Sequence, residues 1–159
     1  MKRNGFVIGL VLLASIAGFG ATPAVAGAAG SHTWELGVLL GEPTGLSAKI
    51  WMTDLGALDF GAAWSFEGDG QFHFHCDYLF HNYDAFKVEQ GSLPIYFGIG
   101  GRIRLDEDDN RLGLRLVVGL EYLFEQYPMS VFFEVAPIVD IAPETEASVN
   151  GGVGIRYVF

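Results

Sequence analysis

The chain contains very little cysteine and few basic residues. Among 159 residues there is one cysteine, Cys76, and nine lysines and arginines stand against nineteen aspartates and glutamates. A single cysteine excludes an intramolecular disulfide framework. A formal net charge of −10 argues against nucleic-acid binding, which needs clustered lysine and arginine. The length suits one domain and leaves no room for a second catalytic or regulatory module.

Charge of either sign is scarce, while apolar residues and glycine are abundant. Charged residues make up 18% of the chain, hydrophobic residues 50% and aromatic residues 14%, and there are 22 glycines. Such a chain has ample apolar surface to bury, which argues against disorder. The composition therefore describes an acidic protein that is hydrophobic overall.

The first 26 residues read as an export signal. Lys2 and Arg3 precede an uncharged apolar run over residues 6–19, and Ala24-Val25-Ala26 has the small-x-small pattern of a cleavage site. The run is too short for a transmembrane helix, which needs about 20 residues. We expect a cleaved signal peptide over residues 1–26 and a mature domain over residues 27–159. The alternative is an uncleaved anchor.

From Thr33 onward, apolar residues alternate with polar or small ones. Alternation with a period of two is typical of β-strands that have one apolar face. Turn-type segments rich in glycine, proline and acidic residues separate the alternating runs. The pattern predicts eight strands, over residues 34–40, 46–52, 58–66, 72–80, 93–105, 111–124, 131–141 and 149–159.

The two faces of these strands differ completely in charge. The apolar face carries no charged residue in any of the eight segments. A soluble lipocalin-type barrel would have to expose this apolar face to water or turn it toward the barrel interior. A membrane barrel has an outward apolar band and a polar interior. We therefore expect an eight-stranded antiparallel transmembrane β-barrel. The expected lumen charges are Glu35, Lys49, Asp59, Asp77, Arg102, Arg104, Arg115, Glu121, Glu134, Asp140 and Arg156, with Arg111 at a strand mouth.

An even number of strands returns the chain to its starting side, so both termini should be periplasmic. The connections on the opposite side contain nine acids and no base. We expect solvated hairpin tips there, with weak divalent-cation binding beside anionic lipid headgroups as the alternative. The segment 106–110 lacks the ligand spacing of an EF-hand loop.

The C-terminal strand resembles the assembly signal of bacterial outer-membrane barrels, in which a polar residue and a glycine precede alternating hydrophobic residues that end in phenylalanine. Gly154, Tyr157 and Phe159 fit this pattern, and Gly152 occupies the position of the polar residue. The resemblance implies that the barrel-assembly machinery is a partner.

Longer segments resemble a family of small, mostly uncharacterised bacterial outer-membrane barrels. The resemblance implies an eight-stranded barrel and little about activity, although a spirochaete branch of the family is associated with binding a host complement regulator. No residue of this sequence can be matched to that role. The segments are Gly45-Leu-Ser-Ala-Lys49, Ala57-Leu-Asp59, Asp77-Tyr-Leu-Phe-His81, Pro94-Ile-Tyr-Phe-Gly-Ile-Gly-Gly-Arg102, Phe133-Glu-Val-Ala-Pro137 and Gly152-Val-Gly-Ile-Arg-Tyr-Val-Phe159.

Paired charges should fill the narrow lumen, since eight strands enclose only enough space for side chains. A structural network is the expected role, with a proton or ion path as the alternative. His73, His75 and Asp77 alternate on one inward face, and a His-x-His pair binds a transition metal when a third ligand approaches. The sequence shows no third ligand, so we expect no metal and no cofactor.

No arrangement of serine, histidine and acid is visible on the outward face, where a lipid-modifying enzyme would need it. Pro137 falls within a strand, which predicts a bulge or an early strand end. The expected function is a non-enzymatic, monomeric outer-membrane barrel of a Gram-negative bacterium, with a plugged polar lumen and a structural or envelope-integrity role. Two alternatives remain: surface binding of a host or envelope ligand through short acidic loops, and a lipid-modifying enzyme.

Overall fold

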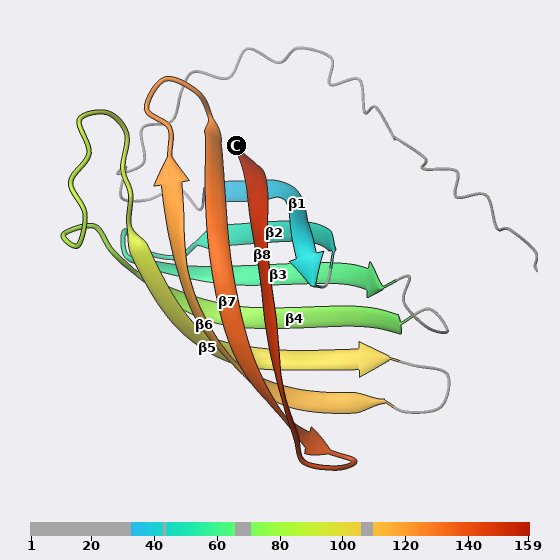
Figure 1. Cartoon of the computed structure of the whole chain (residues 1–159). Helices are drawn as coiled ribbons and strands as arrows, with labels where there is room; N and C mark the ends of the chain where they lie inside the picture. Colours follow the sequence, from blue (N-terminus) through green and yellow to red (C-terminus); the bar gives the residue numbers. More distant parts are fainter. Residues whose placement is uncertain (1–32, 43, 66–70, 106–109) are drawn as a thin grey trace, which may run out of the picture.

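The chain folds into a closed antiparallel β-barrel (Figure 1). The computed structural model describes residues 33–42, 44–65, 71–105 and 110–159. Within this part of the chain, no helix is long and apolar enough to cross a membrane. The strands are β1 (Trp34–Glu42), β2 (Gly45–Trp51), β3 (Gly56–Ser65), β4 (Gln71–Asn82), β5 (Ile95–Leu105), β6 (Arg111–Leu123), β7 (Met129–Ala142) and β8 (Glu146–Val158).

Each strand pairs with its neighbour in sequence, and β1 closes the sheet by pairing with β8. The all-β class and the closed eight-stranded topology predicted from the alternation are confirmed. The bounds differ by a few residues. β5 begins at Ile95 instead of residue 93, after Pro94, which has no N–H to donate to a ladder. The expected signal peptide lies outside the described residues.

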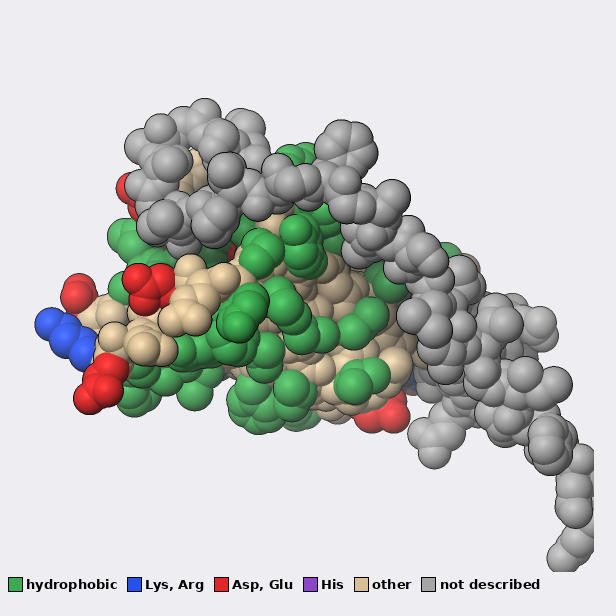
Figure 2. All heavy atoms as spheres, turned by 90° about the horizontal axis from the view of Figure 1, so that it is seen from above, with side chains coloured by type: hydrophobic (Ala, Val, Ile, Leu, Met, Phe, Trp, Pro, Cys, Tyr) green, Lys and Arg blue, Asp and Glu red, His purple; other side chains and the backbone are tan. Residues whose placement is uncertain are grey.

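The predicted division between an outward apolar face and an inward polar face is also confirmed. In β6, Leu116 is 55% exposed whereas its neighbour Arg115 is 1% exposed. The same alternation of exposed and buried residues runs along β7. In Figure 2, hydrophobic side chains cover much of the visible described surface, and acidic and basic side chains lie mainly at its edges. The wall is thus apolar outside and charged inside.

The expectation about Pro137 is wrong, because β7 continues through this residue to Ala142. Pro137 pairs with Val149 on the β8 side. On the β6 side, Arg115 pairs with Ile138, and the next pair is Val118 with Val135. Ala136 and Pro137, which lie between these pairs, have no partner on β6, and the register is the same on both sides of the gap. Loss of local pairing accommodates the missing N–H. The register shift between β6 and β7 lies instead between Leu112 and Gly113.

The longest described connection, residues 83–94, packs against the end of β6 on the side of the barrel where the chain ends. Ser92 bridges to Leu123, and the Tyr122 hydroxyl donates a 2.9 Å hydrogen bond to the Gln90 carbonyl. Burial, with Glu121 and Glu35 nearby, raises the pKa of the Tyr83 phenol well above its ordinary value. This connection therefore places a neutral phenol near that end of the lumen.

Large side chains occupy the barrel interior beside the charged ones. Arg115, Arg156, Tyr96 and Lys49 are the largest of the fully buried side chains. Apolar residues share this space and separate some of the charges. The buried apolar cluster consists of Leu39, Leu79, Tyr96, Val117, Phe132 and Ala136.

Candidate functional site

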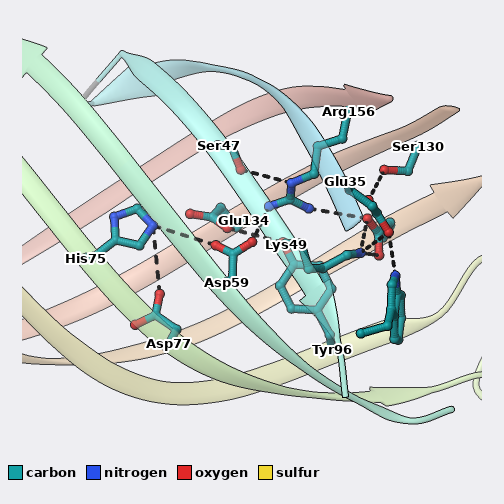
Figure 3. A network of polar contacts seen from close by, with 12 residues as sticks. Glu35, Ser47, Lys49, Asp59, His75, Asp77, Tyr96, Ser130, Glu134 and Arg156 are labelled. Atoms are coloured by element: carbon teal, nitrogen blue, oxygen red, sulfur yellow. Dashed lines mark hydrogen bonds and ion pairs between the residues drawn. The ribbon is translucent and has the colours of Figure 1, made fainter. Parts of the chain in front are cut away.

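The lumen end near the start of β1 and the end of β8 is built around Lys49. Its ammonium lies 2.5 Å and 3.0 Å from carboxylate oxygens of Glu121 and Glu35, and all three side chains are 0% exposed. Trp51 Nε1 donates to Glu35 Oε1 at 2.5 Å, and Ser130 Oγ donates to Glu35 Oε2 at 2.8 Å. We call these five residues the Lys49 cluster; Figure 3 shows it in part. Its carboxylates accept several donors each, as buried anions require.

Arg156, on β8, links this cluster to the middle of the lumen. Its guanidinium contacts Asp59 Oδ1 at 2.5 Å and Glu121 Oε1 at 3.3 Å, and its Nε donates to Ser47 Oγ at 2.9 Å (Figure 3). The same group lies over the Phe132 ring at 3.7 Å from the ring centroid. A planar guanidinium with several donors suits such a central position better than a lysine would.

Arg115, on β6, forms a second group of contacts in the lumen. Its Nη2 donates to Glu134 Oε1 at 2.5 Å, and its Nε lies 3.1 Å from Asp77 Oδ2. The Tyr96 hydroxyl donates to the second Glu134 oxygen at 3.3 Å. Glu134 therefore has a donor on each carboxylate oxygen.

The far end of the lumen holds the remaining arginines. Arg102 donates to both oxygens of Asp140 at 2.7 Å. Arg111 lies at the mouth, in contact with Glu146 and 3.9 Å from Asp140. Arg104 is half-buried beside this group. The pairs thus join strands that are distant in sequence, and register alone does not predict them.

A third group, from β3 and β4, is bound much more loosely. His75 Nε2 lies 3.7 Å from Asp59 Oδ2 and 4.0 Å from Asp77 Oδ2 (Figure 3). One ligand atom from each of these three buried residues lies within 4.8 Å of the other two. Neither Asp77 oxygen has a hydrogen-bond partner within the described part of the chain. We call Asp59, His75 and Asp77 the His75 cluster.

Register and glycine explain how these three side chains meet. Asp59 pairs directly with Asp77, and His75 pairs with Gly61 two residues along the same ladder, on the same face. A Cβ on Gly61 would collide with the His75 ring, and a Cβ on Gly100 would collide with Asp77 Oδ1. The two glycines therefore provide the space that the imidazole and the carboxylate occupy.

Ten of the eleven predicted lumen charges are buried, and Arg104 is half-buried. The sequence placed His75 and Asp77 on one inward face but missed Asp59 as their third neighbour. The antiparallel pairing of β3 with β4 fixes that contact, and the register of these two strands was the signal that could have found it. His73, the other half of the His-x-His pair, lies outside the His75 cluster, and its Nδ1 has no described hydrogen-bond partner.

The three residues of the predicted assembly signal lie at the end of β8. Gly154 is buried in the lumen and Phe159 is 61% exposed, directly after the strand. The Tyr157 and Phe159 rings meet edge-on, with centroids 4.9 Å apart. Their part in assembly stays a prediction.

The serine hydroxyls at Ser47 and Ser130 contact Arg156 and Glu35 and are buried inside the barrel. Both hydroxyls therefore lie away from the outward face, where a lipid-modifying enzyme would need its nucleophile. The expectation of a non-enzymatic protein therefore stays a prediction of the sequence.

A scan against protein-family models and a search of curated proteins give no match for this chain. Among solved structures, the N-terminal β-barrel domain of Pseudomonas aeruginosa OprF is similar, with a TM-score of 0.61 and 14% sequence identity. The match covers 80% of this chain and 96% of that chain. The two proteins therefore share the eight-stranded barrel fold.

Proposed function

We propose that this protein is an integral outer-membrane barrel with a structural, non-enzymatic role in the bacterial envelope. The observation that carries the proposal is the outward face of the wall. Every strand presents large hydrophobic side chains there, from Trp34 and Leu36 on β1 to Val153 and Ile155 on β8, each at least 39% exposed. A soluble monomer rarely exposes apolar patches larger than a few hundred Å².

A bilayer removes this conflict. Hydrocarbon solvates the apolar wall, and closure of the barrel pairs the edge groups that would otherwise lie unpaired in lipid at several kcal/mol each. β4, β6, β7 and β8 have 12, 13, 14 and 13 residues, more than the 9–11 that a tilted strand needs to cross a bilayer.

The packed interior supports a plugged lumen. Arg115 and Arg156 are 1% exposed, and their guanidinium groups contact four carboxylates, on β3, β4, β6 and β7. Buried ion pairs of this kind are costly to break, because loss of one partner leaves the other uncompensated. We therefore propose that the barrel is closed to solutes and is not a general porin.

The remaining parts of the proposal come from the sequence. The basic and apolar segment over residues 1–26 supports export, and Phe159 at the end of β8 supports recognition by the barrel-assembly machinery. Outer-membrane lipids are the main partner, and the barrel acts as a monomer. Two of the acidic connections, residues 66–70 and 106–109, lie outside the described residues, and weak divalent-cation binding there stays a prediction. So does the complement-regulator association.

Cell fractionation and conductance test this proposal. The protein should be recovered with the outer membrane, and purified protein in planar bilayers should show no stable large conductance. Recovery in soluble periplasm without detergent would contradict membrane insertion. Reproducible nanosiemens-scale openings would contradict only the plugged lumen, since an inserted but open barrel would give them.

A further inference from the structure

The buried lumen charges do not balance. Among the described charged side chains that are at most 3% exposed, six are carboxylates and four are lysine or arginine. Two negative charges are therefore in excess among these most deeply buried groups, before the histidines and the half-buried Arg104 and Arg111 at the far end of the lumen are counted. Burial of uncompensated charge is expensive, and proteins relieve it by pairing, by protonation or by coordinating a metal ion.

The buried carboxylate without hydrogen bonds lies in the His75 cluster. Glu35, Glu121, Glu134 and Asp140 each accept at least two hydrogen bonds from side-chain donors. Asp77 accepts none on either oxygen, although it is 1% exposed. Its contact with Arg115 Nε, at 3.1 Å, lacks hydrogen-bond alignment, and that nitrogen also has no described acceptor. Asp77 is thus a buried carboxylate that has an ionic neighbour but accepts no hydrogen bond.

We propose that Asp59, His75 and Asp77 form a binding site for a divalent transition-metal ion, of which Zn²⁺ is the best-suited common example. An imidazole with two carboxylates is a donor set that zinc accepts. Calcium and magnesium prefer all-oxygen sites, so the histidine disfavours them. The ion would place two positive charges between the two carboxylates of the cluster and give Asp77 the partner that its oxygens lack.

Two of the three ligand distances require only a small contraction. Ligand atoms about 2.0–2.1 Å from a tetrahedral zinc ion lie roughly 3.4 Å apart. His75 Nε2 is 3.7 Å and 4.0 Å from the two carboxylate oxygens, a few tenths of an ångström too far. The two carboxylate oxygens lie within 4.8 Å of each other, so the carboxylates must move closer together to bind one ion.

The surroundings hold the ligands in place. Arg156 contacts Asp59 Oδ1, which leaves Asp59 Oδ2 directed at His75. Gly61 and Gly100 leave space for the His75 ring and for Asp77 Oδ1. Because the lumen is packed, the ion would enter while the barrel folds. The inference rests on the fold and on these contacts, and not on the proposed structural role.

The competing explanation is a protonated His75. An imidazolium beside Asp59 and Asp77 would relieve part of the same imbalance without a metal. The two explanations differ in one measurable respect, since protons compete with zinc for the imidazole nitrogen.

The test is refolding of the untagged mature chain, carrying Cys76→Ser, into lipid vesicles with Zn²⁺ present. Cys76 is removed because a thiol binds zinc in its own right. After free metal has been removed by chelator and gel filtration, elemental analysis gives the zinc retained by the folded barrel. Co²⁺ in place of Zn²⁺ reports the ligand set through its visible absorption spectrum.

The variants are Asp77→Asn and His75→Gln, with His73→Gln as the matched control two residues along the same inward face. We expect zinc at one equivalent per barrel in the parent and in His73→Gln. We expect at least a tenfold loss of affinity in the other two. Gel mobility of unheated samples shows whether each variant is folded.

Folded parent barrel that retains no zinc would overturn the inference, as would equal retention by His75→Gln. A His75 imidazolium detected by NMR with zinc in excess would favour protonation and also overturn it. Failure of the parent to insert into vesicles would instead contradict the proposed function. Should Asp77→Asn fail to fold, His75→Gln and the cobalt spectrum of the parent carry the test.

Discussion

The Lys49 cluster and the His75 cluster lie in the same lumen but differ in the hydrogen bonds that their carboxylates accept. Around Lys49, the carboxylates of Glu35 and Glu121 receive hydrogen bonds from an ammonium, an indole and a hydroxyl. Around His75, both Asp77 oxygens are buried without a donor. The first cluster has the features of a structural element that holds the barrel together. The second contains a buried carboxylate, Asp77, that has an arginine 3.1 Å away but accepts no hydrogen bond, and this is the feature on which the metal proposal rests.

The comparison predicts its largest effect at Lys49. Lys49→Met should leave two buried carboxylates without their shared cation and cost about 3–5 kcal/mol of unfolding free energy. Reversible urea unfolding in lipid vesicles measures this cost. The matched control is Lys87→Met in the exposed connection after β4, for which we expect a change within about 0.5 kcal/mol. Equal effects would mean that the Lys49 cluster stabilises nothing.

Both clusters belong to the lumen only if the faces of the wall are assigned correctly. Leu116→Arg places a charge on the outward face of β6 and should cost roughly 2–4 kcal/mol near the bilayer midplane. Its neighbour Arg115 faces inward, and Arg115→Lys should be milder, since it keeps the charge and loses only the planar pairing. The same urea experiment compares the two. An equally harmless Leu116→Arg would reverse the faces and favour a lipocalin-like barrel with an apolar interior.

The smallest expected change in unfolding free energy is at Asp77, and comparing it with the change at Glu121 tests the difference between the two clusters. Glu121→Gln weakens hydrogen bonds to a charged partner and should cost about 1.5–3 kcal/mol. Asp77→Asn removes a charge that has no hydrogen-bond donor, so in metal-free protein we expect a change within about 1 kcal/mol of zero. Urea unfolding with chelator present gives both values. If Asp77→Asn costs as much as Glu121→Gln, Asp77 is as well compensated as Glu121 and the contrast disappears.

Much of the barrel could be predicted from the sequence because the side-chain period of a strand is fixed. The alternation in β6 alone separates Leu112, Leu114 and Leu116 from Gly113 and Arg115, and the structure keeps that separation. The number of strands and their antiparallel order follow from eight such segments joined by turn-type connections. Strand ends were less accurate, since β7 extends beyond its predicted bounds at both ends.

The contacts across the lumen could not be predicted in the same way. Which arginine meets which acid depends on how the sheet closes and on the stagger between strands that are far apart in sequence. Asp59 and Arg156, for example, are 97 residues apart and meet at 2.5 Å. Pro137 shows a second limit: a residue that breaks an isolated ladder was accommodated by two skipped pairs instead of a bulge.

We propose that a lipid bilayer is the environment in which the apolar outer wall of this barrel is stable. The most direct measurement dilutes urea-unfolded mature chain either into lipid vesicles or into lipid-free, detergent-free buffer, and then compares boiled and unheated samples on SDS gels. We predict that a faster-migrating, protease-resistant band appears in unheated samples only when vesicles are present. A compact, protease-resistant monomer formed equally well without lipid would contradict the claim.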